Sequence, residues 1–188
     1  MVNAAAGMRY RTIVCDPPWR YPHGMPGFSR DLSNGSTVPY ATMSVAEIAA
    51  LPVAALAGPD AHLYLWVTNT HLPHAWEVVR AWGFTYSTLL TWCKVPRGAP
   101  FFPAYAVCTE HVLFCRRGTL PAKTRQDRNW WEWRRRQHSA KPEHFIDMVE
   151  QVSPGPYLEL FSRRHRLGWS VWGDEVGSSI DLAQAGAE

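Results

Sequence analysis

Residues 15–21 read CDPPWRY, so an acid, two prolines and two aromatic side chains directly follow an apolar run. Proline lacks an N–H group and has a fixed φ angle, which makes the carbonyls of this stretch rigid acceptors. The Asp16 carboxylate and one such carbonyl could accept both N–H groups of an amine on a planar ring, with Trp19 or Tyr21 stacked on that ring. An amine nitrogen held this way becomes tetrahedral, and its lone pair can attack an electrophilic carbon. The alternative is a structural turn in which Asp16 caps a backbone N–H.

A strand must carry this stretch, because residues 11–15 are apolar and β-branched. Further strands are predicted at 62–68, 85–94, 105–115, 156–161 and 168–173, with 105–115 paired to 85–94, and helices after Ser44, over 71–82 and over 142–152. The helix after Ser44 opens on a capping box with Glu47. This alternation predicts an α/β fold whose parallel sheet is covered by helices on both faces. We expect one domain over residues 8–176 and a disordered tail over 177–188.

Polar residues follow three of the predicted strands at the point where each strand ends. Asp16 follows the first strand, Asn69 follows the strand at 62–68, and the run RRHR (163–166) follows the strand at 156–161. Ligands of open α/β sheets bind beyond the carboxyl ends of the strands. We therefore expect these residues to face one cleft.

The net charge of the 188 residues is +3, which does not by itself indicate a nucleic-acid partner. The charge is unevenly distributed, because residues 116–136 interleave Lys and Arg with Trp130, Trp131 and Trp133. Arginine neutralises phosphates and indole rings stack on unpaired bases, so this stretch could bind a polynucleotide. The alternatives are a solvated loop, or tryptophans that cover the core or a partner subunit.

Cysteine usage and hydropathy restrict the class of protein. The four cysteines (Cys15, Cys93, Cys108 and Cys115) form no C-x-x-C pair and no cluster with zinc-ligand spacing, so we expect reduced thiols and no metal. Residues 1–11 lack the apolar core of a signal peptide, and no apolar run reaches the length of a membrane span. The sequence thus predicts a cytoplasmic protein with no membrane segment.

Several motifs in order resemble the MT-A family of S-adenosylmethionine-dependent adenine N6-methyltransferases, which includes the catalytic subunit of the eukaryotic messenger-RNA adenosine methyltransferase and many bacterial and phage enzymes. The motifs are DPPW, PYATMSVAEIAAL, HLYLWVTNTHLPHAWEVVRAWGF, LLTWCK, TEHVLF and KPEHFIDMVEQVSPGPYLELFSRRHRLGWSVWG, over residues 11–176. The resemblance implies a Rossmann-like class I methyltransferase sheet in circularly permuted order, with the catalytic motif before the cofactor strand. This order accounts for the lack of a G-x-G-x-x-G motif after the first strand.

The resemblance also assigns roles to residues. It implies a catalytic loop of Asp16, Pro17, Pro18 and Trp19. The cofactor S-adenosyl-L-methionine is expected to contact Cys15, Asp16, Lys141, Phe161, Arg163, His165, Arg166, Asp174 and Glu175, with its methionine carboxylate on Lys141. The substrate is expected to contact Trp19, Tyr21, Tyr40, Trp66, Asn69, Glu110, Trp130 and Trp131. Structural alternatives stay open: Lys141 as a solvated helix start, the run 163–166 as a solvated turn, and Glu110 as the partner of an arginine.

The activity implied is methyl transfer to the N6 amine of adenine in nucleic acid, with DNA favoured over RNA. One alternative is methylation of free adenine or of an adenine nucleoside or nucleotide, and another is a non-catalytic nucleic-acid-binding subunit. The chain is short for a sequence-specific enzyme of this kind, because only the loops 22–42, 95–104 and 116–139 are available for target recognition. A homodimer, or a heterodimer with a paralogue, is a further implication of the resemblance.

Overall fold

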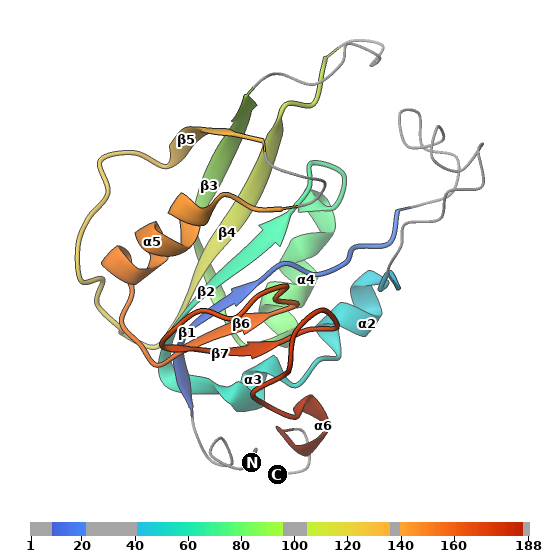
Figure 1. The fold of residues 1–188 in the computed structure, drawn as a ribbon, viewed down its shortest axis with the longest axis vertical. Helices are drawn as coiled ribbons and strands as arrows, with labels where there is room; N and C mark the ends of the chain where they lie inside the picture. The colour runs from blue at the N-terminus through green and yellow to red at the C-terminus, as the bar shows by residue number, and fades with distance from the viewer. Residues whose placement is uncertain (1–8, 22–40, 96–104, 136–139, 186–188) are drawn as a thin grey trace.

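A computed structural model gives the fold and describes residues 9–21, 41–95, 105–135 and 140–185. The strands are β1 (Tyr10–Cys15), β2 (Ala57–Val67), β3 (Thr85–Val95), β4 (Thr109–Arg117), β5 (Trp130–Arg134), β6 (Tyr157–Leu160) and β7 (Trp169–Trp172). The helices are α2 (Val45–Ala49), α3 (Val53–Leu56), α4 (Leu72–Ala81), α5 (Glu143–Val152) and α6 (Leu182–Ala185). The strands form one seven-stranded sheet in the order β5-β3-β4-β2-β1-β6-β7 (Figure 1).

All strands of this sheet except β4 run in the same direction. β4 is antiparallel to both of its neighbours, β2 and β3, whereas the other neighbouring strands pair in parallel. The carboxyl ends of six strands and the amino end of β4 therefore meet at one edge of the sheet. The predicted pairing of residues 105–115 with 85–94 is confirmed, and so is the α/β fold.

The position of β1 explains why the chain has a cleft at this edge. β1 pairs with β2 on one side and with β6 on the other. The strands that follow β1 in the chain, β2 to β5, lie on the β2 side, whereas the last two strands, β6 and β7, lie on the opposite side. The point where the order reverses is where ligands bind in open α/β sheets. Asp16 follows β1 and Phe161 follows β6, so the two residues flank that point.

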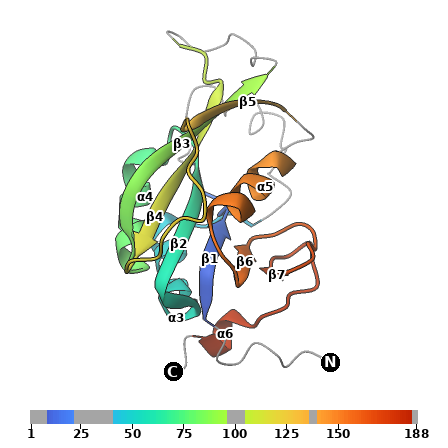
Figure 2. The same ribbon diagram turned by 90° about the vertical axis from the view of Figure 1, so that its left-hand side faces the viewer.

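Helices cover both faces of the sheet, as the alternating pattern predicts. α5 and α4 lie on opposite faces (Figure 2), and the buried side chains of α2 and α3 belong to the same core cluster as those of α4. Phe145, Ile146, Met148 and Val149 form the buried side of α5. The predicted capping box of α2 is present, because the Ser44 hydroxyl accepts from the Glu47 N–H and the Glu47 carboxylate accepts from the Ser44 N–H.

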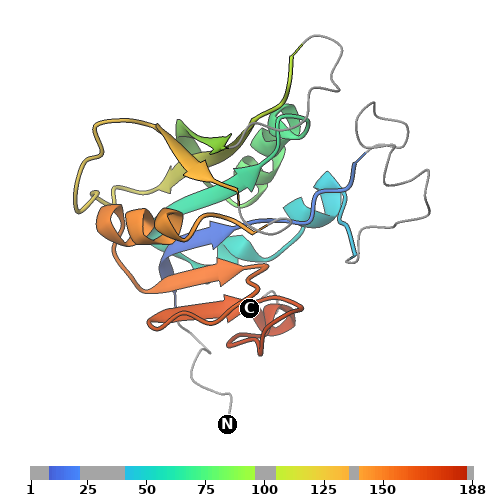
Figure 3. The same cartoon turned by 45° about the horizontal axis from the view of Figure 1, so that its top comes forward.

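Two segments differ from the prediction. Residues 130–134, expected to be irregular, form the edge strand β5, which pairs in parallel with β3. The tail, expected to be disordered from residue 177, is described as far as Ala185, and Ile180 and Leu182 are buried in the core. The Ser179 N–H donates to the Val171 carbonyl at 2.7 Å, so this tail covers the outer edge of β7 (Figure 3). Both segments are too short to show a periodic pattern in the sequence.

Candidate active site

The loop after β1 is held rigidly by the chain on either side of it. The N–H of Asp16 continues the ladder to the Leu160 carbonyl of β6 at 3.5 Å. The Pro17 carbonyl accepts from the N–H of Trp19 at 2.9 Å, and the Pro18 carbonyl accepts from the N–H of Met43 at 2.8 Å. Each carbonyl oxygen has a second lone pair. The role predicted for these carbonyls, as acceptors for an amine, therefore stays a prediction.

Trp19 is not an open platform for a ring. Only 5% of its surface is exposed, its Nε1 donates to the Trp66 carbonyl at 3.0 Å, and its indole stacks on His71 with the ring centroids 5.3 Å apart. Tyr21 also contacts His71, edge to face at 4.7 Å. In this structure both aromatic residues of the loop contribute to its packing against the start of α4.

His71 is an organising residue that the sequence reasoning missed. Its Nε2 lies 3.0 Å from the Arg20 carbonyl, which can only accept, so Nε2 carries the proton. Its Nδ1 therefore accepts from the Thr68 hydroxyl at 2.9 Å. Burial lowers the pKa of His71, which favours this neutral form. In the sequence, His71 lies in a run of polar residues before a helix and carries no signal of burial.

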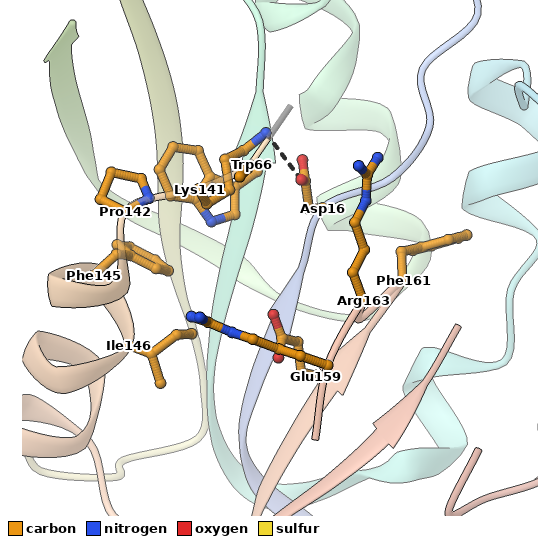
Figure 4. A pocket seen from close by; sticks show the side chains of 11 residues that line it. Asp16, Trp66, Lys141, Pro142, Phe145, Ile146, Glu159, Phe161 and Arg163 are labelled. Carbon is orange, nitrogen blue, oxygen red and sulfur yellow. Dashed lines mark ion pairs between the residues drawn. The ribbon is translucent and has the colours of Figure 1, made fainter. Parts of the chain in front are cut away.

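A pocket of about 230 Å³ opens beside Asp16, between the start of α5 and the end of β6 (Figure 4). It is lined by Asp16, Trp66, Ala140, Lys141, Pro142, Phe145, Ile146, Glu159, Phe161, Arg163 and Arg164. Five of the residues predicted from the sequence therefore meet here: Asp16, Trp66, Lys141, Phe161 and Arg163. They come from β1, β2, the start of α5 and the turn after β6.

Lys141 connects the loop after β1 to β4. Its Nζ lies 2.9 Å from Asp16 Oδ2 and 3.2 Å from Glu110 Oε2, and the other oxygen of Glu110 accepts from Lys94. The partners of Glu110 are thus two lysines, not the arginine that the structural alternative expects. Lys141 is likewise not a solvated residue at the start of the helix.

The charges of this group shift one another's pKa values. Burial raises the pKa of Asp16, and the attraction of Lys141 offsets only part of this effect. Burial also acts on Glu110, but the two lysines outweigh it and lower the pKa of that carboxyl. For Lys141, the carboxylates of Asp16 and Glu110 outweigh burial and raise the pKa of the ammonium. The lysine therefore stays charged at neutral pH, between two carboxyl groups.

Glu159 is a second residue that the sequence reasoning missed. It lies in β6, lines the pocket and accepts from the Ser162 hydroxyl at 2.9 Å, and burial raises its pKa. Its signal in the sequence is an acid in the middle of the apolar strand YLELF. A buried carboxylate facing a pocket can accept hydrogen bonds from ligand hydroxyl or amine groups.

Phe161 has a backbone conformation that is unusual for a side chain of its size. Its φ angle is +61°, in the left-handed region, and its ring meets Trp172 edge to face at 5.1 Å. Strained backbone of this kind is concentrated at functional sites. The strain here turns the chain sharply at the end of β6, where it leaves the sheet beside the pocket.

Other predicted cofactor residues do not line the pocket. Arg166 is bound to α5 instead, with its guanidinium 2.7 to 2.8 Å from the Glu150 and Asp147 carboxylates, which raise its pKa. His165 and Asp174 are exposed. Glu175 forms an ion pair with Arg163 at 3.3 Å, and through it reaches the rim of the pocket.

Cys15 and the remaining predicted substrate residues lie in different places. Cys15 is fully buried in β1, and burial raises the pKa of its thiol, so it stays neutral. Asn69 is exposed and donates to the Thr109 carbonyl at 3.0 Å, at the amino end of β4. Trp130 and Trp131 lie in the edge strand β5. Tyr40 lies outside the described residues.

Part of the basic stretch makes contacts within the chain. The side chain of Arg117 donates to the carbonyls of Trp82, Gly83 and Ala54, and Arg116 donates to the Leu120 carbonyl. Lys123 donates to the Glu150 carbonyl near the end of α5, and Arg128 pairs with Asp127. These four cations are therefore engaged in contacts within the chain.

The described residues allow two further statements. No group of three or more His, Cys, Asp or Glu side chains among them could hold a metal ion. None of the helices in the same ranges is both long and apolar enough to cross a membrane.

Comparison with known proteins identifies relatives along almost the whole chain. The family model MT-A70 matches residues 10–175. The chain is 29% identical over 184 residues to the type II methyltransferase M.MunI of Mycoplasma sp, covering 89% of this chain and 78% of that protein.

Two more relatives are longer than this chain. The chain is 27% identical over 186 residues to the N(6)-adenine-specific methyltransferase METTL4 of Homo sapiens, covering 89% of this chain and 37% of that protein. It is 29% identical over 187 residues to the N6-methyladenosine RNA methyltransferase MTA1 of Cryphonectria parasitica, covering 92% of this chain and 53% of that protein. The chain therefore belongs to the MT-A70 family, a family of methyltransferase enzymes with a Rossmann-like fold, as its motifs predict.

Proposed function

We propose that this protein transfers a methyl group from S-adenosylmethionine to the exocyclic N6 amine of adenine in nucleic acid, with DNA preferred over RNA. The observation that carries the proposal is the pocket beside Asp16, in which a carboxylate held at the end of β1 faces a mixed cationic, acidic and aromatic lining. Family membership supports the reaction type, and the proposal adds the cofactor, the substrate and the residue roles.

The lining of the pocket fits S-adenosylmethionine chemically. The cofactor supplies the electrophilic methyl group on a sulfonium sulfur. Lys141 and Arg163 offer cations for its carboxylate, and Glu159 offers a carboxylate for hydroxyl or amine groups. The side chains of Phe161 and Phe145 offer apolar and aromatic surface for a planar ring.

In this proposal Asp16 and the proline carbonyls orient the nucleophile. The ionised Asp16 carboxylate accepts one N–H of the adenine amine, and a carbonyl of Pro17 or Pro18 accepts the other. Held in this way, the amine lone pair would be free to attack the methyl group that the bound cofactor would supply, and the amine would afterwards release one proton to solvent. The residues act by orientation and electrostatics.

The preference for DNA rests on the relatives. Of the three relatives named above, M.MunI is the one whose own length is covered most fully, and it is a type II methyltransferase. The relative from Cryphonectria parasitica is named as an RNA methyltransferase. An adenine inside a duplex is out of reach, so the enzyme must flip the base or act on single strands. A partner subunit that contributes to target recognition is part of the proposal. The chain spans 37% and 53% of the length of the two longer relatives.

One observation favours a second candidate, methylation of free adenine or of an adenine nucleoside or nucleotide. Arg116, Arg117 and Lys123 donate to carbonyls of the chain and Arg128 pairs with Asp127, which leaves these side chains fewer N–H donors for a polynucleotide backbone. A small substrate would need only the pocket and the loop.

The test is a transfer assay with labelled S-adenosylmethionine and, separately, duplex DNA, single-stranded DNA, RNA, adenosine and adenine. We expect label on N6 of adenine in DNA, identified by mass spectrometry after digestion to nucleosides. Label on adenosine or adenine but not on any polynucleotide would establish the second candidate instead. No transfer to any of the five, with the cofactor bound in calorimetry, would disprove both.

A further inference from the structure

The ion pairs at the active site extend beyond the pocket to Lys94, the last residue of the motif LLTWCK, to which the sequence analysis assigns no role. Glu110 uses both carboxylate oxygens: Oε2 lies 3.2 Å from the Lys141 ammonium, and Oε1 accepts from the Lys94 ammonium. Lys141 in turn contacts Asp16 at 2.9 Å. Four side chains of alternating charge, here called the charge relay (Lys94, Glu110, Lys141 and Asp16), thus connect β3 to the catalytic loop.

The relay is largely shielded from water, most strongly at its far end. The side-chain exposure is 18% for Lys94, 17% for Glu110, 22% for Lys141 and 33% for Asp16. Asp16, at the pocket, is therefore the most accessible member. In surroundings of this kind, removing one charge leaves its neighbour uncompensated, which is costly.

Each of the two ammonium groups also lies over an aromatic ring. Lys141 Nζ lies 5.0 Å from the centroid of the Trp66 ring, and Lys94 Nζ lies 5.2 Å from that of Trp92. Both distances are within the range of cation–π attraction. Each lysine is thus held by a carboxylate and by an indole ring.

The sheet register sets the geometry of the far end. Glu110 is the direct partner of Trp92 in the β3–β4 ladder, and Lys94 lies two residues beyond Trp92 on the same face. Side chains alternate between faces along a strand. A slip of one residue would therefore move Lys94 to the opposite face, so the contact is built into the pairing of these strands.

We propose that Lys94 and Glu110 are positioning residues that act on Asp16 through Lys141: Glu110 holds the Lys141 ammonium on its far side, and Lys94 offsets the pull of Glu110 and so keeps that ammonium against the Asp16 carboxylate. This inference rests on the proposed function in assigning a catalytic task to Asp16. It adds that the state of Asp16 is set by a residue of β3 that does not touch it.

The charged groups around Asp16 determine the sign of each expected change. Lys141 and Glu110 face it from the start of α5 and from β4, and Arg163 faces it from the turn after β6. The charge of Asp16 in turn raises the pKa of Glu159 in β6. Without Lys94, the only cation left beside Glu110 among the described residues is Lys141. Glu110 then draws the Lys141 ammonium away from Asp16, and the loss of this nearby cation raises the pKa of Asp16. Without the Glu110 charge, Lys141 pairs with Asp16 alone, which lowers the pKa of Asp16.

The test is a ¹³C NMR titration of the Asp16 carboxyl in the protein without cofactor or substrate, with the signal assigned by its loss in Asp16→Asn. We expect a higher pKa in Lys94→Met and in Lys94→Gln, and a lower one in Glu110→Gln. The double variant Lys94→Met/Glu110→Gln should match Glu110→Gln alone, because Lys94 acts only through Glu110. Lys94→Arg should keep the wild-type value, as should the matched control Lys123→Met.

Turnover gives a second measurement. Lys94→Met should lower kcat about tenfold with little change in the KM of the nucleic acid, and move the acid limb of the pH–rate profile to higher pH. An unchanged Asp16 titration in both Lys94→Met and Lys94→Gln, or additive effects in the double variant, would overturn the relay. Because the titration needs no substrate, absence of methyl transfer would disprove the proposed function alone.

Discussion

Asp16 combines two properties that an orienting carboxylate needs: a fixed position after β1 and a nearby cation. Asp16→Asn keeps the shape of the side chain but removes its charge. We expect kcat for methyl transfer to fall by about 10² to 10³, while cofactor affinity stays within a few-fold of wild type because Lys141, Arg163 and Glu159 remain. Single-turnover assays and calorimetry measure the two quantities.

The pH dependence of this residue has a definite sign. Burial raises the pKa of Asp16 above the usual value for an aspartate, so activity that needs the ionised form is lost as the pH falls through that raised pKa. Asp127→Asn is the control, because Asp127 is exposed and pairs only with Arg128 among the described residues. Near-normal turnover in Asp16→Asn would contradict the role assigned to the carboxylate.

The three neighbouring tryptophans of β5 should respond differently to truncation. Trp131 and Trp133 stack on each other at 5.5 Å and pack against the core under α5, whereas Trp130 is 50% exposed. Trp133→Ala should lower the free energy of unfolding by about 2 to 3 kcal/mol. Trp130→Ala should leave stability within about 0.5 kcal/mol and weaken binding to single-stranded DNA several-fold. Urea unfolding and fluorescence anisotropy measure the two effects.

At the site, sequence motifs identify some residues and not others. Asp16, Trp66, Lys141, Phe161 and Arg163 line the pocket and were all predicted. Lys94, His71 and Glu159 were missed because each depends on contacts between segments far apart in the chain: Lys94 with Glu110, His71 with Arg20, and Glu159 with the pocket wall. The side-chain types alone carry no record of these partners.

At the scale of elements, the loop 16–21 depends on the start of α4. His71 donates to the Arg20 carbonyl and accepts from Thr68, while its ring lies against Trp19 and Tyr21. His71→Phe keeps a ring but removes both hydrogen bonds, leaving a carbonyl and a hydroxyl without their partner. We expect a loss of about 1 to 3 kcal/mol in unfolding free energy at pH 7.5, measured by urea unfolding.

The size of this loss should depend on pH. Burial lowers the pKa of His71, so below about pH 6.5 the unfolded chain takes up a proton that the folded protein resists. The wild type then loses stability that His71→Phe, with no titrating ring, does not lose. The difference between the two proteins should therefore be smaller at pH 5.5 than at pH 7.5. A difference that stays constant or grows would contradict a buried neutral imidazole.

Long, patterned elements were predictable, and short ones were not. The strand at 85–94 and the helix at 142–152 match β3 and α5 within one residue at each end. β2 begins at Ala57, five residues before the predicted start, because its first half contains Gly58 and Pro59, which do not suggest a strand. β5 has five residues and exists because β3 offers it an edge to pair with.

At the scale of the whole molecule, the two edges of the sheet differ. The β7 edge is covered by the tail: the Ser179 N–H donates to the Val171 carbonyl, and its hydroxyl accepts from the Val171 N–H at 3.2 Å. At the other edge, β5 pairs with β3 on its inner side, and no other described strand pairs with its outer side. Open edges invite pairing with other chains, so the tail both extends the core and protects one side of the sheet.

Truncation after residue 176 tests this double role of the tail. It removes Ile180 and Leu182, each 7% exposed in the core, together with the cover of β7. Loss of two buried aliphatic side chains should cost about 3 kcal/mol or more in unfolding free energy, and the bared edge should promote aggregation. Urea unfolding and light scattering measure the two effects.

Two full-length variants separate these effects. Ile180→Ala/Leu182→Ala should reproduce the loss of stability without the aggregation, and Asp181→Asn, an exposed neighbour, should have neither effect. A truncated chain as stable and as monodisperse as the full chain would contradict this role and support the disordered tail that the sequence predicts.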